Sequence, residues 1–248
     1  MLSYILLMLA AFTSGVLNAI AGGGAFITFP ALLFAGVPPV GANATSTVAL
    51  FPGQAASAWA YRQDIGDVRE VSVIAFVVLS LIGGLIGALL LLFTSNAVFA
   101  RLVPWLLLFA TLVFAAGNFM GKGVAAGRVR LGHRGVLVTQ FLISIYGGYF
   151  GGGIGFLMLA ALTLFGMRDI HAMNGLKILL ATLMNGAAVI AFAIAGIVHW
   201  PETLAMAAAS VVGGYVGALG AKRVDQRVIK GCVIALGAAL TVYFFWHG

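Results

Sequence analysis

The stretch SLIGGLIGAL at residues 80–89 returns as SVVGGYVGAL at residues 210–219, so the pattern SxxGGxxGAL occurs twice with a spacing of 130 residues. Two runs of three glycines, at 22–24 and 151–153, lie 129 residues apart, and Phe26 and Phe156 beyond them are again 130 apart. A long internal repeat of this kind indicates that one structural unit is present twice. Duplicated membrane units that pack around a common axis are typical of secondary transporters, in which the substrate is bound where the units meet.

The composition is that of a membrane protein. Hydrophobic residues make up 62% of the 248 residues and charged residues 8%, whereas charged residues form about a quarter of a soluble domain. The mean hydropathy is +1.14. The net charge of +7 comes from Lys and Arg residues in short loops, which marks membrane orientation and not nucleic-acid binding. The single cysteine, Cys232, excludes an intramolecular disulfide framework and a multi-cysteine metal site, and we expect no cofactor.

Apolar runs between breaker residues predict an all-α polytopic membrane protein with two inverted repeats of about five helical segments each. We expect a first membrane repeat over residues 1–121, a cytoplasmic connector over 122–133 and a second membrane repeat over 134–248. The predicted segments are 2–21, 25–36, 40–61, 68–93, 97–120, 134–150, 154–166, 170–197, 201–221 and 228–247.

The second segment of each repeat is short. Segments 25–36 and 154–166 provide only about 15–18 Å of helix, against a hydrocarbon core of roughly 30 Å. Neither can comfortably cross a membrane alone. We therefore expect each to form a broken or re-entrant helix with the segment before it, the glycine run making the turn.

Two loops rich in Lys and Arg set the predicted orientation, because basic loops face the cytoplasm. They carry Lys122, Arg128, Arg130 and Arg134 in one case and Lys222, Arg223, Arg227 and Lys230 in the other. Each repeat then has an odd number of chain reversals, whether its glycine hairpin crosses the membrane or only dips into it. The second repeat is therefore inverted relative to the first, and both chain ends lie outside the cytoplasm.

Lys177 is the strongest single indication of function. It lies about 10 Å into a long apolar helix, where an unpaired charge is costly. Asn174 and Asn185 fall near its face of the helix, and no acidic residue is close in sequence. A polar stripe with one cation predicts a site for a small anion that acts as counter-ion. The alternative is a lysine that reaches the membrane interface or binds backbone carbonyl groups of a broken helix.

The corresponding helix of the first repeat carries a second polar stripe. Asn43, Thr47 and Gln54 share a face at helical spacing, and Thr45 and Ser46 add hydroxyl groups near the helix start, where backbone N–H groups are unpaired. Thr47 occupies the position of the lysine in the other repeat. Two such helices would surround an oxyanion with hydrogen-bond donors. Helix hydroxyl groups also bind the preceding turn or join helices, which is an equally good explanation of them.

The glycine runs are candidate anion sites as well. A glycine-rich turn at a helix N-terminus points peptide N–H groups at a ligand, and the recurrence of the turn strengthens this interpretation against close packing. For SxxGGxxGAL we expect packing alone. Asn18, on the approach to the first run, is a secondary candidate. The six glycines are Gly22, Gly23, Gly24, Gly151, Gly152 and Gly153.

The acidic residues argue against a carboxylate proton relay, because all of them lie at segment ends or in loops. They are Asp64, Asp67, Glu70, Asp169, Glu202 and Asp225. If transport is coupled to protons, His171 near the start of the Lys177 helix is the candidate carrier. A structural polar cluster with Arg168 and Asp169 is the alternative.

Two stretches carry a family resemblance: residues 15–62, which begin GVLNAIAGGGAFITFP, and residues 147–218, which begin GGYFGGGIGFLML. They resemble the TauE/SafE sulfite exporter family, and the likeness covers essentially the whole chain. The resemblance implies a multi-pass carrier of the bacterial inner membrane for sulfite, sulfoacetate or related small organosulfur or carboxylate anions, with export the favoured direction and sulfite or an organosulfonate the favoured substrate. In that membrane, the chain ends that the basic loops place outside the cytoplasm are periplasmic. Carried over by position, the repeat motifs of the family fall on Asn18, Gly22 to Gly24, Asn43 to Thr47, Gly151 to Gly153, Asn174, Lys177 and Asn185.

The sequence therefore predicts a secondary transporter whose partners are a small anion and the lipid bilayer, and it leaves open whether the chain forms a homodimer. An anion channel could share the same site, and a non-transporting scaffold would leave Lys177 unexplained. An intramembrane enzyme would need a nucleophile with a base, or a metal cluster. The apolar segments offer neither, so we do not expect an enzyme.

Overall fold

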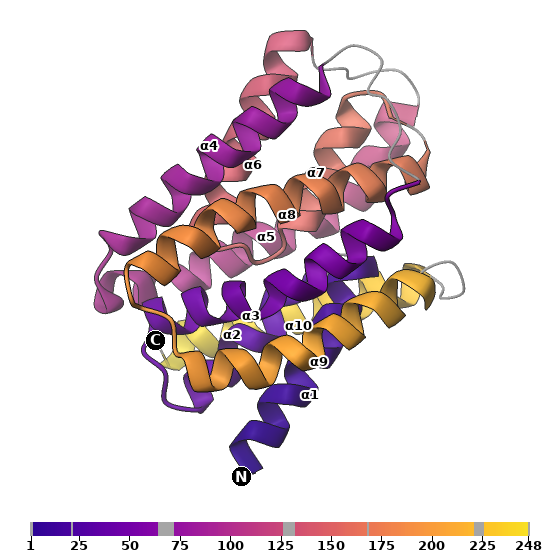
Figure 1. The fold of residues 1–248 in the computed structure, drawn as a ribbon. Helices are drawn as coiled ribbons and strands as arrows, with labels where there is room; N and C mark the ends of the chain where they lie inside the picture. Colours follow the sequence, from indigo (N-terminus) through magenta and orange to yellow (C-terminus); the bar gives the residue numbers. More distant parts are fainter. Residues whose placement is uncertain are drawn as a thin grey trace.

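The computed structural model describes residues 2–20, 22–63, 72–125, 132–167, 169–220 and 226–247. These residues form ten α-helices and no strand (Figure 1). The helices are α1 Leu2–Ile20, α2 Ala25–Phe34, α3 Pro39–Ala60, α4 Val73–Leu92, α5 Asn96–Ala125, α6 His133–Tyr149, α7 Ile154–Leu164, α8 Ile170–Ile194, α9 Trp200–Gly220 and α10 Gln226–His247. The predicted all-helical class and the ten segments are confirmed, with most ends displaced by only a few residues.

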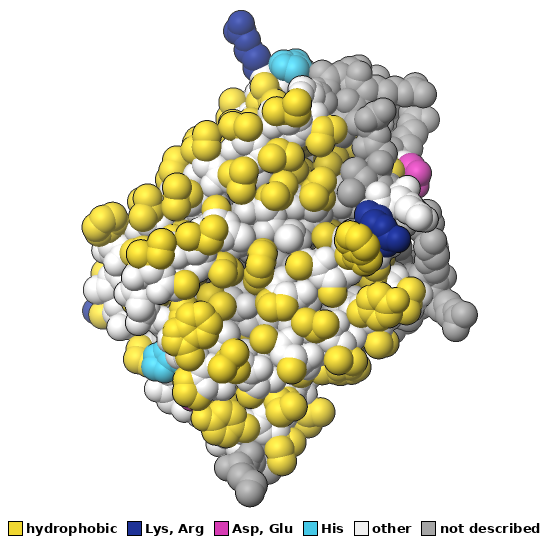
Figure 2. Space-filling view, in the orientation of Figure 1, with side chains coloured by type: hydrophobic (Ala, Val, Ile, Leu, Met, Phe, Trp, Pro, Cys, Tyr) yellow, Lys and Arg dark blue, Asp and Glu magenta, His cyan; other side chains and the backbone are white. Residues whose placement is uncertain are grey.

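The outside of the molecule is apolar. Five helices, α1, α4, α5, α8 and α9, contain stretches long and apolar enough to cross a membrane. Figure 2 shows hydrophobic side chains over most of the visible face, with charged side chains at its edges. Phe93 and Trp246 are 87% and 86% exposed, which in water would favour aggregation but in lipid is the expected state. α3 has 22 residues but is not among the five, because polar side chains lower its hydropathy.

The two short helices have similar lengths and end in the same way. α2 has 10 residues and α7 has 11, so they are only about 15 and 17 Å long. Each ends at a glycine with φ of +89°, Gly36 after α2 and Gly166 after α7. In both cases the next residue donates its N–H to a carbonyl near the end of the helix, which is the Schellman pattern. The sequence repeat is thus reproduced in the backbone at the C-terminal ends of these two helices.

The helices pack into two units, and each unit contains one helix from the other predicted repeat. α9, from the second repeat, packs against α1 and α3, whereas α4, from the first repeat, packs against α6 and α8 (Figure 1). We call α1, α2, α3 and α9 the first unit, and α4, α6, α7 and α8 the second unit. α3 and α8 meet at the boundary between the units, and α5 packs against α10. The packed units therefore differ from the sequence repeats.

The motif SxxGGxxGAL makes this exchange possible. A Cβ atom on Gly84 of α4 would lie 2.4 Å from the carbonyl oxygen of Met184 in α8, and a Cβ on Gly214 of α9 would lie 2.4 Å from that of Gly53 in α3. Real Cβ atoms do not approach so closely. The absence of a side chain lets the helix backbones touch, and the prediction that this motif serves packing is confirmed.

Gly84→Ala should therefore lower the free energy of unfolding by about 1–3 kcal/mol, because the added methyl group has no space. Gly231→Ala in α10 is the matched control, since a Cβ there meets nothing within 4 Å and alanine is the better helix former. Its stability should stay the same or rise. Thermal unfolding of the detergent-solubilised protein measures both, and equal melting temperatures would contradict the tight contact between α4 and α8.

Candidate functional site

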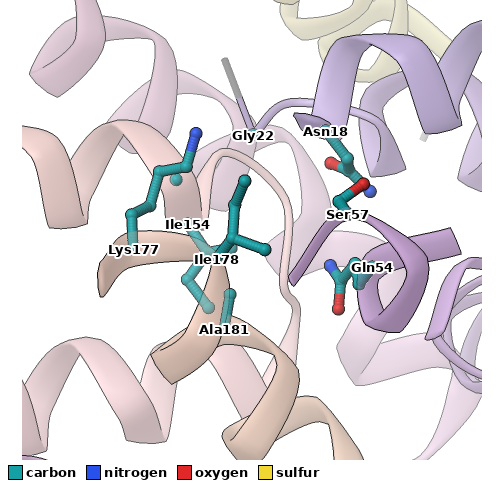
Figure 3. A pocket seen from close by; sticks show the side chains of 9 residues that line it. Asn18, Gly22, Gln54, Ser57, Ile154, Lys177, Ile178 and Ala181 are labelled. Carbon is teal, nitrogen blue, oxygen red and sulfur yellow. The ribbon is translucent and has the colours of Figure 1, made fainter. Parts of the chain in front are cut away.

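A small cavity lies between the two units. Its lining residues are Asn18 of α1, Gly22 in the turn after α1, Gln54 and Ser57 of α3, Ile154 and Gly155 of α7, and Lys177, Ile178 and Ala181 of α8. Figure 3 shows Lys177, Ile178 and Ala181 on one side, facing Gln54 and Ser57 on the other. Each unit therefore supplies one wall of the cavity.

The cavity has room for one or two water molecules. The cavity volume is about 20 Å³, and one water molecule needs roughly 10–15 Å³ of such volume. Any larger occupant, including an anion with three oxygens, would require the two units to move apart.

Lys177 carries the only charge among the lining residues that the structure describes. Its side chain is 1% exposed, so it does not reach the membrane interface. Its Nζ atom donates a hydrogen bond of 3.0 Å to Oδ1 of Asn174, one helical turn earlier. No carboxylate of the described residues forms an ion pair with it. An ammonium group has three N–H donors, so two of them are left for a ligand.

Gln54 faces the lysine from α3 with its own donors free. Its Oε1 atom accepts a hydrogen bond of 2.8 Å from Nδ2 of Asn185. Within the described chain, no group accepts from Nε2 of Gln54. Figure 3 shows this nitrogen on the side of the amide nearer Ser57 and Asn18, with the oxygen on the other side. The amide therefore has N–H donors free, whereas its oxygen already accepts one of the two hydrogen bonds it can accept.

Asn18 also has its amide oxygen bound by a protein donor. Its Oδ1 atom accepts a hydrogen bond of 2.8 Å from the backbone N–H of Gly24, and this fixes the amide because a backbone N–H can only donate. Ser57 uses its hydroxyl proton on the carbonyl groups of Gly53 and Gly214, at 2.9 and 3.1 Å. The lining thus has its amide oxygens occupied and its amide and ammonium N–H groups available, which suits an anion.

The first glycine turn meets the start of α7 beside the lysine. The N–H of Gly155 donates to the carbonyl of Gly22 at 3.4 Å, and a Cβ atom on Gly22 would lie 2.4 Å from Cα of Gly155. Of the six predicted glycines, Gly22 lines the cavity, whereas Gly23, Gly24, Gly151, Gly152 and Gly153 are not among its lining residues. The N–H groups of Gly24 and Gly155 already bind protein acceptors, so these turns shape the wall.

The polar residues at the start of α3 also lie away from the cavity lining. Asn43 donates to the carbonyl of Tyr149 at 3.0 Å. The hydroxyl groups of Thr45, Ser46 and Thr47 bind other protein groups at distances of 2.6 to 3.0 Å. This is the arrangement expected of side chains that join helices.

Among the predicted residues, the structure brings Lys177, Gln54, Asn18 and Gly22 together at one cavity. Asn174 and Asn185 lie behind it, each bound to a lining side chain. The side chain of His171 lies outside the described residues. The lining residues that sequence reasoning missed are Ser57, Ile154, Gly155, Ile178 and Ala181. Helical spacing could have found Ser57 and Ala181, which follow Gln54 and Lys177 by one turn.

Comparison with known proteins decides the family. Residues 7–244 match the family described as Sulfite exporter TauE/SafE. The chain belongs to the TauE/SafE family. It is therefore a multi-pass membrane protein of a transporter family and not an enzyme.

Relatives of this TauE/SafE chain align with it over nearly its whole length. A probable membrane transporter protein of Haemophilus influenzae is 31% identical, covering 95% of this chain and 92% of that protein. The probable membrane transporter protein ORF9 of Sinorhizobium is also 31% identical, over 95% and 90%. The probable membrane transporter protein YfcA of Escherichia coli is 26% identical, over 98% and 90%. No solved structure matches the chain.

The contact between Gly22 and Gly155 predicts a difference between two glycines that have the same φ angle. Gly22 and Gly36 both have φ of +89°, but a Cβ on Gly36 meets nothing within 4 Å. Gly36→Ala should cost only the backbone strain, about 1 kcal/mol. Gly22→Ala adds a clash with Gly155 and should cost about 1–3 kcal/mol more. Melting temperatures in detergent test this, and an equal loss in both variants would show that Gly22 and Gly155 do not touch.

Proposed function

We propose that this TauE/SafE protein is a secondary transporter of the bacterial inner membrane that exports a small anion, sulfite or an organosulfonate such as sulfoacetate. The supporting observation is which donors and acceptors of the cavity lining are bound to protein groups and which donors are not. The oxygens of Asn18 and Gln54 are occupied by protein donors, while their NH₂ groups and the Lys177 ammonium have unused N–H donors. Lys177, Gln54 and Asn18 would bind the substrate directly.

The energetics of the buried lysine favour an anionic substrate. An ammonium group inside a protein has lost its hydration, and one neutral hydrogen bond to Asn174 replaces only part of that. A bound oxyanion would supply the missing charge and form charge-assisted hydrogen bonds. A cation would be repelled, and a neutral solute would leave the charge uncompensated. The small cavity favours sulfite over the longer sulfoacetate, because the walls would have to move apart less for sulfite.

Transport would follow from movement of the two units around this cavity. We expect the first and second units to change their angle at the boundary between α3 and α8, which would open the cavity to each side of the membrane in turn. Inverted sequence repeats would make the two open states similar in energy. In this proposal the two basic loops face the cytoplasm and both chain ends face the periplasm.

Lys177→Met should abolish sulfite transport, because methionine has a similar length but no charge. Loss of a charge-assisted hydrogen bond costs about 1.5–3 kcal/mol, a factor of roughly 10–150 in affinity. Removal of a buried charge should leave the melting temperature unchanged or higher. The measurement is the initial rate of sulfite uptake by proteoliposomes containing purified protein.

Arg101→Met is the matched control, since Arg101 lies on α5 with an exposed side chain. It removes the same charge and should transport at the wild-type rate. Wild-type flux in Lys177→Met would contradict the proposed site, and equal losses in both variants would indicate a general effect of charge.

A further inference from the structure

Asn185 lies behind the cavity wall and binds one of its residues. It is on α8, is 5% exposed, and is not among the lining residues. Its Nδ2 atom donates the hydrogen bond of 2.8 Å to Oε1 of Gln54. Because Gln54 belongs to α3, this bond joins the second unit to the first across the boundary where they meet.

The oxygen of the same amide has no partner. Oδ1 of Asn185 is buried and accepts no hydrogen bond from the described residues. A buried unsatisfied acceptor lowers stability. Leucine is close to asparagine in size and would remove this defect, so asparagine at position 185 does not serve stability best. The role of Asn185 therefore depends on the group to which its N–H donates, which is Gln54.

We propose that Asn185 is a positioning residue that fixes the amide of Gln54 so that its N–H donors face the cavity. An unanchored glutamine amide can turn either its oxygen or its nitrogen toward a ligand. The Nδ2 group of Asn185 can only donate, so it selects the orientation in which the oxygen of Gln54 points away from the cavity. The reverse arrangement of both amides would leave both N–H donors of Asn185 unsatisfied, against one oxygen and one N–H in the observed arrangement.

This inference rests on the proposed function, since it assigns Asn185 to the selection of an anion. Without Asn185, Gln54 could present its oxygen and repel the ligand. Asn185 would therefore influence sulfite binding without touching sulfite. The bond also crosses the unit boundary, so the donor orientation of Gln54 is tied to the arrangement of α3 and α8 seen in this structure.

A double-mutant cycle tests this in proteoliposomes with sulfite as the probe. Asn185→Leu should raise KM by about 2- to 10-fold, the range of one neutral hydrogen bond, and Gln54→Leu should raise it at least as much. The double variant should have the KM of Gln54→Leu alone, because Asn185 acts only through Gln54. The melting temperature of Asn185→Leu should equal or exceed that of the wild type.

Gln140→Leu is the matched control. Gln140 is a buried amide of α6 that donates to Ser80 at 2.9 Å and is not among the cavity-lining residues. Its loss should lower the melting temperature and leave KM unchanged.

Three results would overturn the inference. They are an unchanged KM in Asn185→Leu, multiplied KM effects in the double variant, and a fall in the melting temperature of Asn185→Leu as large as that of Gln140→Leu. Absence of sulfite flux in the wild type would instead reject the proposed substrate, and the melting temperatures would still decide whether Asn185 is a structural residue.

Discussion

The ammonium group of Lys177, buried without an ion-pair partner among the described residues, is the constraint on which the site depends. The neutral oxygen of Asn174 compensates it only in part. The amide oxygens of Asn18 and Gln54 each already accept one hydrogen bond, from Gly24 and Asn185. The charge also occurs once in a duplicated chain, since its repeat position is Thr47. The protein therefore holds one asymmetric positive site and leaves its neutralisation to a ligand.

Direct backbone contacts place this charge at the boundary between the two units. Gly84 and Gly214 let α4 and α9 pack among helices of the opposite repeat. Gly22 and Gly155 let the first glycine turn touch the start of α7 beside the lysine. These contacts contain almost no side-chain atoms, so the helices sit at fixed close distances. The cavity then has one wall from each unit. Any change in the angle between the units changes its shape.

Much of the fold could be predicted from the sequence because apolar runs broken by glycine and proline leave few alternatives in a membrane. The start of α7 at Ile154 was predicted to the residue. The exchange of α4 and α9 could not be predicted, because SxxGGxxGAL shows a small-residue face but not the helix that it meets. The same applies to side chains: Asn43 and Gln54 share a stripe in sequence, yet Asn43 binds a backbone oxygen and Ser57 lines the cavity instead.

The most direct measurement is a structure determined with selenite, the selenium counterpart of sulfite, by anomalous diffraction. The account predicts a selenium peak inside the cavity, within hydrogen-bond distance of Nζ of Lys177 and Nε2 of Gln54. A selenium peak bound elsewhere in the protein, or a Lys177 side chain that extends to the lipid headgroups, would contradict it.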